Sequence, residues 1–153
     1  MTYDLITRAR QVAANAYAPY SGFAVGCVVE TTDGKRFDGA NMENASYGVG
    51  MCAEVGALMA ASLGSGLASV ERVFVAGGLL AAGGQVAGEE VVTPCGRCRQ
   101  LIAEAAQLSG RDVEVVCASG DGTIVKRHFI SELLPHAFGP ASLAGASSAI
   151  AAE

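Results

Sequence analysis

The chain has 153 residues, the length of one domain; 51% of them are hydrophobic and 16% are charged, which excludes a disordered polar chain. Its net charge is -5 at pH 7 and it has no run of basic residues, so we do not expect a nucleic acid polymer as partner. No basic flank precedes an apolar stretch at the N-terminus, and the longest apolar run, residues 73–84, is too short and too rich in glycine for a membrane span.

The chain begins with a pattern typical of one helix followed by a β-hairpin. Apolar residues recur at helical spacing over residues 3–17, with Thr2 as the expected N-cap. Residues 23–31 predict a buried strand. The Asp-Gly pair at 33–34 is a turn signal, and it leads to a second strand over residues 36–40.

The middle of the chain predicts a loop, a helix and a strand. Residues 41–50 are polar and bounded by glycine, which indicates a loop. Residues 51–63, rich in alanine and leucine, predict a helix, and residues 72–76 predict a short apolar strand. The glycine-rich connection over residues 77–90 shows no clear pattern.

The last third predicts a helix over residues 94–108, strands over 113–117 and 124–129, and a short helix over 131–134 capped by its serine. Alternation of strands and helices after an opening hairpin indicates an α/β layered domain with a mixed sheet of about five strands.

We assign residues 1–140 to a single domain and residues 141–153, rich in alanine and serine, to a flexible tail.

Cys27 and Cys117 lie in apolar stretches and are expected to be buried in strands. An odd number of cysteines, five, with no export signal fits reduced thiols in the cytoplasm.

The remaining cysteines carry most of the chemical information. Cys52 lies far upstream of Cys95 and Cys98, and together they offer three thiolates to one zinc ion. Three protein ligands leave one tetrahedral position open, as in catalytic zinc sites. Glu54, two residues after the first ligand, is close enough to handle the protons of a bound water, an arrangement typical of zinc-dependent deaminases.

A closed structural zinc site is the alternative interpretation. It would need His128 or His136 as fourth ligand, and neither histidine has the paired spacing usual in such sites.

Several segments together resemble one enzyme family. In chain order they are FAVG at 23–26, NMENASYG at 41–48, CAE at 52–54, PCGRCRQ at 94–100, ELLP at 132–135 and FG at 138–139. In these segments, and over residues 9–139 as a whole, the chain resembles the small homotetrameric cytidine deaminases. The resemblance implies a three-layer α-β-α sandwich with a mixed five-stranded sheet and one zinc ion per subunit. It also implies hydrolysis of cytidine and 2′-deoxycytidine to the uridines with release of ammonia, a step of pyrimidine salvage.

The resemblance assigns roles around the metal. Cys52, Cys95 and Cys98 bind the zinc ion. Glu54 takes a proton from the water, passes it to N3 of the base and later protonates the leaving amine. Ala53 offers its backbone N–H to the base carbonyl.

The resemblance also places the nucleoside. Asn41 and Glu43 match the residues that hold the ribose 3′-hydroxyl, and an amide with a carboxylate can grip one hydroxyl as donor and acceptor. Phe23 matches the residue that packs on the pyrimidine.

Three further residues match positions that act across subunits. Ala45 and Tyr47 reach into a neighbour's site, and Phe138 is an aromatic that also crosses. The expected partners are therefore a small nucleoside substrate and the other subunits of a homotetramer with shared active sites.

One position departs from the family. Many relatives carry arginine directly after Cys-Ala-Glu, where this chain has Val55. Three thiolates leave the zinc site negatively charged, and we hypothesise that Arg97, between two of the ligands, offsets that charge.

Two alternatives remain open at this stage. An aliphatic residue after Cys-Ala-Glu, together with PCGRCRQ, also resembles the blasticidin-S deaminases of the same superfamily. A non-catalytic zinc fold is the alternative from a different class, and the intact Glu54 argues against it.

Overall fold

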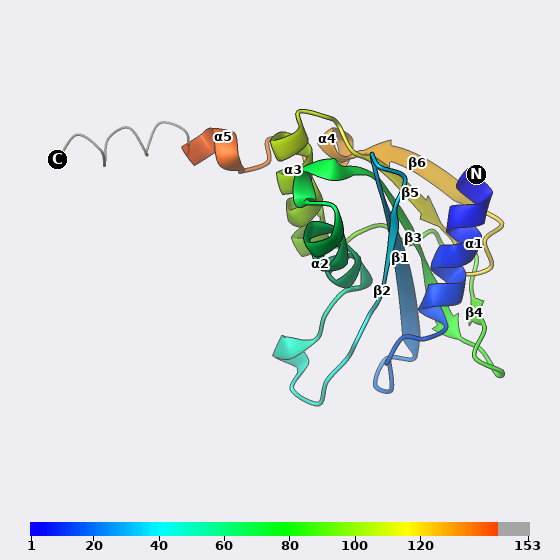
Figure 1. Ribbon diagram of the computed structural model, residues 1–153. Coiled ribbons are helices and arrows are strands. Elements are labelled where there is room, and N and C mark those ends of the chain that lie inside the picture. Colours follow the sequence, from blue (N-terminus) through cyan, green and yellow to red (C-terminus); the bar gives the residue numbers. More distant parts are fainter. Residues whose placement is uncertain (144–153) are drawn as a thin grey trace, which may run out of the picture.

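The computed structural model describes residues 1–143 and contains a mixed β-sheet between two layers of helices (Figure 1). The strands are β1 Phe23–Thr31, β2 Arg36–Ala40, β3 Val70–Leu80, β4 Val86–Ala87, β5 Glu114–Ala118 and β6 Val125–Phe129. Their order is β2-β1-β3-β5-β6, and the short β4 pairs with β3. The β3–β5 pair is parallel and the other pairs are antiparallel, so the sheet is mixed as expected.

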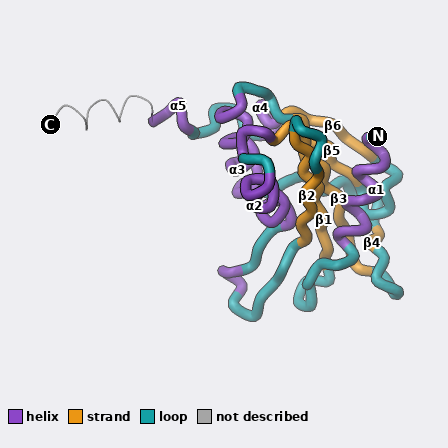
Figure 2. Tube along the Cα trace, viewed as in Figure 1, coloured by secondary structure: helices purple, strands orange, loops and turns teal. Residues whose placement is uncertain are grey.

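Helices cover both faces of the sheet, with α1 on one side and α2 and α3 on the other (Figure 2). The helices are α1 Thr2–Ala13, α2 Ala53–Gly64, α3 Gly96–Ser109, α4 Ile130–Leu133 and α5 Pro140–Leu143, with short 3₁₀ turns at Tyr47–Val49 and Leu67–Ser69. None of the helices in residues 1–143 is long and apolar enough to cross a bilayer.

The alternation of β1 divides its side chains between two cores. Cys27 and Val29 point to the core beneath α2 and α3, whereas Val28 points to the core beneath α1. Cys117 belongs to the first core, and both Cys27 and Cys117 are fully buried with free thiols, as the sequence predicts.

Glycines let the helices lie close to the sheet. A Cβ atom at Gly39 in β2 would overlap the backbone of Ala53 and Ala57 in α2. A Cβ atom at Gly26 in β1 would overlap the backbone of Ala9 in α1 in the same way. These contacts fix both helices against the sheet at backbone distance, and α2 is the helix on which the predicted site begins.

The predicted first helix is too long at its C-terminal end. α1 ends at Ala13, because Tyr17 leaves the helix to pair with the segment after β2. The Tyr17 N–H donates to the Asn41 carbonyl at 3.1 Å, and the Glu43 N–H donates to the Tyr17 carbonyl at 2.7 Å. The N-cap of α1 is Met1 rather than Thr2.

Two strand predictions also need correction. β3 runs over 11 residues and includes part of the glycine-rich connection, because it pairs with β1 along its length and with β4 at its end. The sheet therefore has six strands, the expected five and the two-residue β4.

The serine cap predicted for the short helix near residue 131 is wrong. Ser131 donates instead to Asp112, and the N-terminus of α4 is capped by Glu132, which accepts the N–H of Phe129 at 2.7 Å. Of the predicted tail over 141–153, residues 141–143 belong to α5 and the rest lies outside the described residues.

Candidate functional site

Two helices begin at cysteines and bring three thiols together. Cys52 is the N-cap of α2 and Cys95 is the N-cap of α3, each with extended backbone before the first turn. Cys98 lies in the first turn of α3. The free N–H groups and the positive end of the helix dipole at both N-termini favour thiolates at these positions.

The distances between the sulfur atoms fit one metal ion. The Sγ atoms of Cys52 and Cys95 are 3.7 Å apart, and those of Cys95 and Cys98 are 3.5 Å apart. A tetrahedral zinc ion with Zn–S bonds of about 2.3 Å holds its sulfur ligands roughly 3.8 Å apart. All three sulfur atoms lie within 4.8 Å of one another, and they form the metal-ligand cluster found in residues 1–143. Neither His128 nor His136 belongs to it, so the closed-site interpretation gains no support.

The thiols differ in their surroundings. Burial raises the pKa of Cys52 above the ordinary thiol value and raises that of Cys98 well above it. Burial also acts to raise the pKa of Cys95, but hydrogen bonds from the backbone and thiol of Cys98 outweigh it and hold the value below normal. A metal ion that binds thiolates displaces the remaining protons, so zinc binding and deprotonation are coupled.

Glu54 lies in the first turn of α2 beside the thiols. Its side chain is only 4% exposed. Burial raises the pKa of the Glu54 carboxyl above its ordinary value, and hydrogen bonds from its own backbone and from Cys98 partly oppose the rise. A carboxyl whose pKa is raised toward neutrality is suited to both accept and donate a proton.

Two of the thiols, Cys52 and Cys95, share a cavity with Glu54 and the predicted ribose residues. The cavity has a volume of about 390 Å³, which is enough for a nucleoside-sized molecule. Besides Cys52, Cys95 and Glu54, its walls include Asn41 and Glu43. Ala53, at the first helical position of α2, also lines it, with its N–H free of an intrahelical partner.

Asn41 is fixed against the edge of β1. Its Oδ1 accepts the N–H of Val25 at 2.7 Å and its Nδ2 donates to the carbonyl of Phe23 at 3.0 Å. An amide nitrogen has two hydrogens, so one N–H of Asn41 remains for another partner. Glu43 is held by the turn before β1, through Tyr20 and Ser21.

The other predicted substrate residues do not all line this cavity within one chain. Tyr47 lines it and is 80% exposed, whereas Phe23, Ala45 and Phe138 lie outside its walls. Phe138 is 61% exposed and accepts a hydrogen bond from Gln100 through its carbonyl at 2.6 Å. A single chain thus leaves several of these side chains uncovered.

The arginines near the ligands take different positions. The Nη2 of Arg97 lies 3.3 Å from the sulfur of Met51, the residue that precedes Cys52. Within residues 1–143, Arg97 makes no hydrogen bond to a thiol. Val55 is buried, with 5% of its surface exposed.

Sequence reasoning missed the role of Arg99. Its Nε donates to the carbonyl of Pro94 at 2.8 Å and its Nη1 to the carbonyl of Leu133 at 2.9 Å. A weaker contact of 3.4 Å joins its Nη2 to Thr93, which lines the cavity. Arg99 thereby joins Pro94, the residue before Cys95, to Leu133 at the end of α4. The sequence shows only that an arginine directly follows Cys98. It does not indicate that this arginine binds the carbonyls of Pro94 and Leu133.

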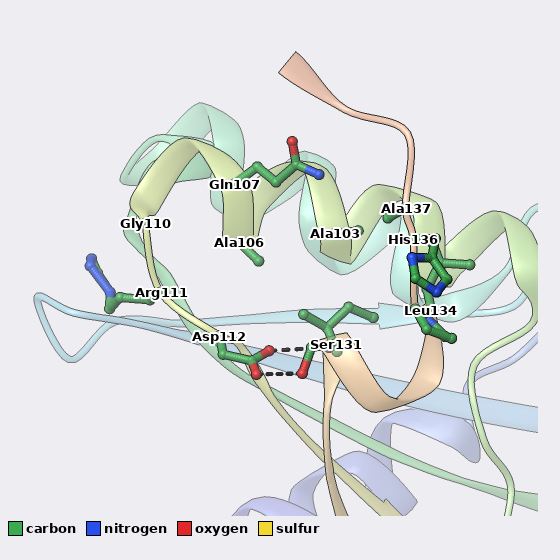
Figure 3. Close-up of a pocket in the computed structure, with 12 residues that line it drawn as sticks. Ala103, Ala106, Gln107, Gly110, Arg111, Asp112, Ser131, Leu134, His136 and Ala137 are labelled. Carbon is green, nitrogen blue, oxygen red and sulfur yellow. Dashed lines mark hydrogen bonds between the residues drawn. The ribbon is translucent and has the colours of Figure 1, made fainter. Parts of the chain in front are cut away.

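A second cavity lies away from the thiols, between α3, α4 and the segment that follows α4 (Figure 3). Its volume is about 430 Å³, slightly larger than that of the first. The carboxylate on its wall, Asp112, is already paired with the N–H and hydroxyl of Ser131. It contains no cysteine and none of the predicted site residues, so the cavity beside Glu54 remains the candidate site.

Comparison with known proteins identifies relatives of the chain. A family model described as the cytidine and deoxycytidylate deaminase zinc-binding region matches residues 2–116, which contain all three ligands. The cytidine deaminase of Halalkalibacterium halodurans is 40% identical over 134 residues, 88% of this chain and 91% of that protein. That of Mycobacterium tuberculosis is 39% identical over 132 residues, 86% of this chain and 84% of that protein.

The fold is similar to that of solved relatives. The crystal structure of cytidine deaminase from Burkholderia pseudomallei superposes with a TM-score of 0.76 at 36% sequence identity, over 90% of this chain and 99% of that one.

The anchoring of Cys95 by Arg99 can be tested by metal retention. Arg99→Ala removes the donors to Pro94 and Leu133, so we expect zinc to be lost to a chelator about tenfold faster, since partners behind metal ligands typically change metal affinity by that order. The measurement is zinc release to a colorimetric chelator. Arg111→Ala, which removes an exposed arginine bound to the Ala68 carbonyl, is the matched control. Equal release rates in both variants would contradict the anchoring role.

Proposed function

The chain belongs to the zinc-dependent cytidine and deoxycytidylate deaminase family, and we propose that it hydrolyses cytidine and 2′-deoxycytidine to uridine and 2′-deoxyuridine with release of ammonia. It is a hydrolytic deaminase acting on the C–N bond of a cyclic amidine, with one zinc ion per subunit at Cys52, Cys95 and Cys98. The observation that carries the proposal is the buried Glu54 in the same cavity as Cys52 and Cys95, two of the three clustered thiols.

Proton transfer falls to Glu54. When bound, the zinc ion would supply a water whose pKa is lowered toward roughly 7. The Glu54 carboxylate takes a proton as the water oxygen forms its bond to C4, and it delivers that proton to N3. Glu54 then takes the second proton, from the hydroxyl now bonded to C4, and delivers it to the exocyclic amine; the C4–N bond breaks, the C4 carbonyl forms and ammonia leaves. Ala53 offers its free N–H to the base carbonyl.

Asn41 and Glu43 are the residues proposed to hydrogen-bond the ribose 3′-hydroxyl. Asn41 has one N–H left to donate, because its other amide contacts go to the backbone of β1. Hydrogen bonds from Ser21 and Tyr20 lower the pKa of Glu43, so at neutral pH it is a carboxylate that accepts only. The two side chains therefore offer one donor and one acceptor, which a hydroxyl group matches. Phe23 is the proposed aromatic against the pyrimidine.

A homotetramer with shared active sites is the assembly we propose. Tyr47 and Phe138 are exposed aromatics and Ala45 is exposed in the same loop as Tyr47, which supports their role at a neighbouring subunit's site. A cytoplasmic location and a role in pyrimidine salvage are part of the same proposal, and the five free cysteines support a reducing compartment.

A blasticidin-S deaminase is not the better alternative, because the relatives with 39–40% identity over most of the chain are named cytidine deaminases. Parallel assays separate the two: loss of the cytidine absorbance band supports the proposal, and turnover of blasticidin S without turnover of cytidine would overturn it.

Glu54→Gln should abolish deamination while zinc stays bound. The amide cannot accept the proton, and general acid–base groups typically contribute about 100-fold or more to the rate. The measurements are the ultraviolet change of cytidine and the zinc content per subunit. Glu71→Gln, an exposed glutamate at the start of β3, is the control. Surviving turnover in the Glu54 variant would rule out its role in proton transfer. A non-catalytic zinc fold would instead release no ammonia even from the unmodified protein.

Arg97→Gln tests the proposed charge compensation. Because the three thiolates outweigh the charge of one zinc ion, removal of the Arg97 guanidinium should lower kcat for cytidine about fivefold and speed zinc loss, as removed outer partners do at metal sites. Arg97→Lys, which keeps the charge, should recover most of the loss. Unchanged turnover and zinc retention in Arg97→Gln would contradict this role.

Complementation tests the shared site. The native mass should be about 60 kDa, four times the 15.4 kDa of one chain. Phe138→Ala should be poorly active, as should Glu54→Gln, but tetramers made by co-expressing the two variants should regain activity. In such a tetramer an intact Phe138 from one subunit can meet an intact Glu54 of another. A monomeric mass, or no regain of activity, would contradict shared sites.

A further inference from the structure

The turn between α1 and β1 holds both oxygens of the Glu43 carboxylate. The N–H groups of Tyr20 and Ser21 donate to Oε2 at 2.8 and 3.2 Å. The hydroxyl of Ser21 donates to Oε1. The loop that carries Glu43 and this turn both extend beyond the same end of the sheet, where the cavity lies (Figure 1).

The hydroxyl of Ser21 has no freedom to turn elsewhere. It accepts the N–H of Phe23 at 3.0 Å, and its one hydrogen goes to Glu43. Ser21 thus connects the carboxylate proposed for the ribose with the aromatic proposed for the base. Phe23 is connected in turn to Asn41, whose Nδ2 donates to its carbonyl.

We propose that Ser21 is a positioning residue, which fixes the rotation of the Glu43 carboxylate and thereby sets the preference of the enzyme for nucleosides with a 3′-hydroxyl. The inference rests on the proposed function, since it takes Glu43 as the acceptor for that hydroxyl. Without the Ser21 hydroxyl, the two backbone N–H groups still hold Oε2, but Oε1 loses its partner and the carboxylate plane can turn.

The effect should be confined to ribose recognition. Glu54 is held in the first turn of α2 by hydrogen bonds from its own backbone and from Cys98, so we expect proton transfer at the base not to depend on the Ser21 hydroxyl. A loss of ribose binding raises KM, whereas damage to the proton relay would lower kcat.

The experiment compares Ser21→Ala with Ser21→Thr on cytidine and on 3′-deoxycytidine, which lacks the hydroxyl in question. For Ser21→Ala we expect kcat/KM on cytidine to fall about tenfold, mainly through KM, with a change of about twofold at most on 3′-deoxycytidine. Ser21→Thr keeps a hydroxyl at an exposed position and should restore cytidine turnover. Ser65→Ala removes a comparable bond, from Ser65 Oγ to Asp33 at 3.0 Å, remote from the site, and should change neither substrate.

A second measurement guards against a general effect on the fold. In a Glu43→Gln background, Ser21→Ala should add little further loss on cytidine, because both changes disrupt the same contact. Equal losses on the two substrates, additive losses in the double variant, or no loss at all would each overturn the role of Ser21. Failure of the unmodified protein to deaminate cytidine would instead overturn the proposed function itself.

Discussion

The close approach of α2 to β2 is the constraint on which the site depends. Gly39 has no Cβ, and only for that reason can the backbone of Ala53 lie directly against the strand. This contact fixes the N-terminus of α2, and with it Cys52 at the N-cap and Glu54 in the first turn, at one end of the sheet. The N-terminus of α3 meets it there, so the ligands come from two helix starts rather than from a flexible loop. A site built on rigid elements holds its groups in place before the substrate arrives.

Within residues 1–143, no arginine or lysine side chain is hydrogen-bonded to the three thiols. Val55, directly after Glu54, is apolar and buried and supplies no charge here. What remains near the sulfur atoms are the N–H groups and dipoles of two helices, together with Arg97 at the adjacent Met51. Arg99 donates to the backbone carbonyls of Pro94 and Leu133, which supports a role in fixing the geometry of the site.

Local sequence signals predicted most of the architecture. The strands at 23–31 and 36–40 were predicted with the observed bounds, since the alternation of side chains and the Asp-Gly turn are local properties. The cysteine spacing likewise predicted a three-thiol cluster. The errors came from long-range pairing: Tyr17 leaves its helix to bind Asn41 and Glu43, and β3 extends through glycines because β1 lies beside it. The binding of Glu43 by Ser21 could not be predicted for the same reason, since no local pattern links residues 22 positions apart.

The β1–β2 hairpin, built on the Asp-Gly turn, lies at the end of β1 opposite Phe23 and the cavity. At its tip Thr32 is exposed and its side chain makes no hydrogen bond to any of residues 1–143, whereas Asp33 binds Thr31 and Ser65 and must be kept. The tip therefore offers an attachment point for a dye, a surface tether or an inserted peptide. Immobilised through this hairpin, the protein would keep its substrate cavity turned toward the solution.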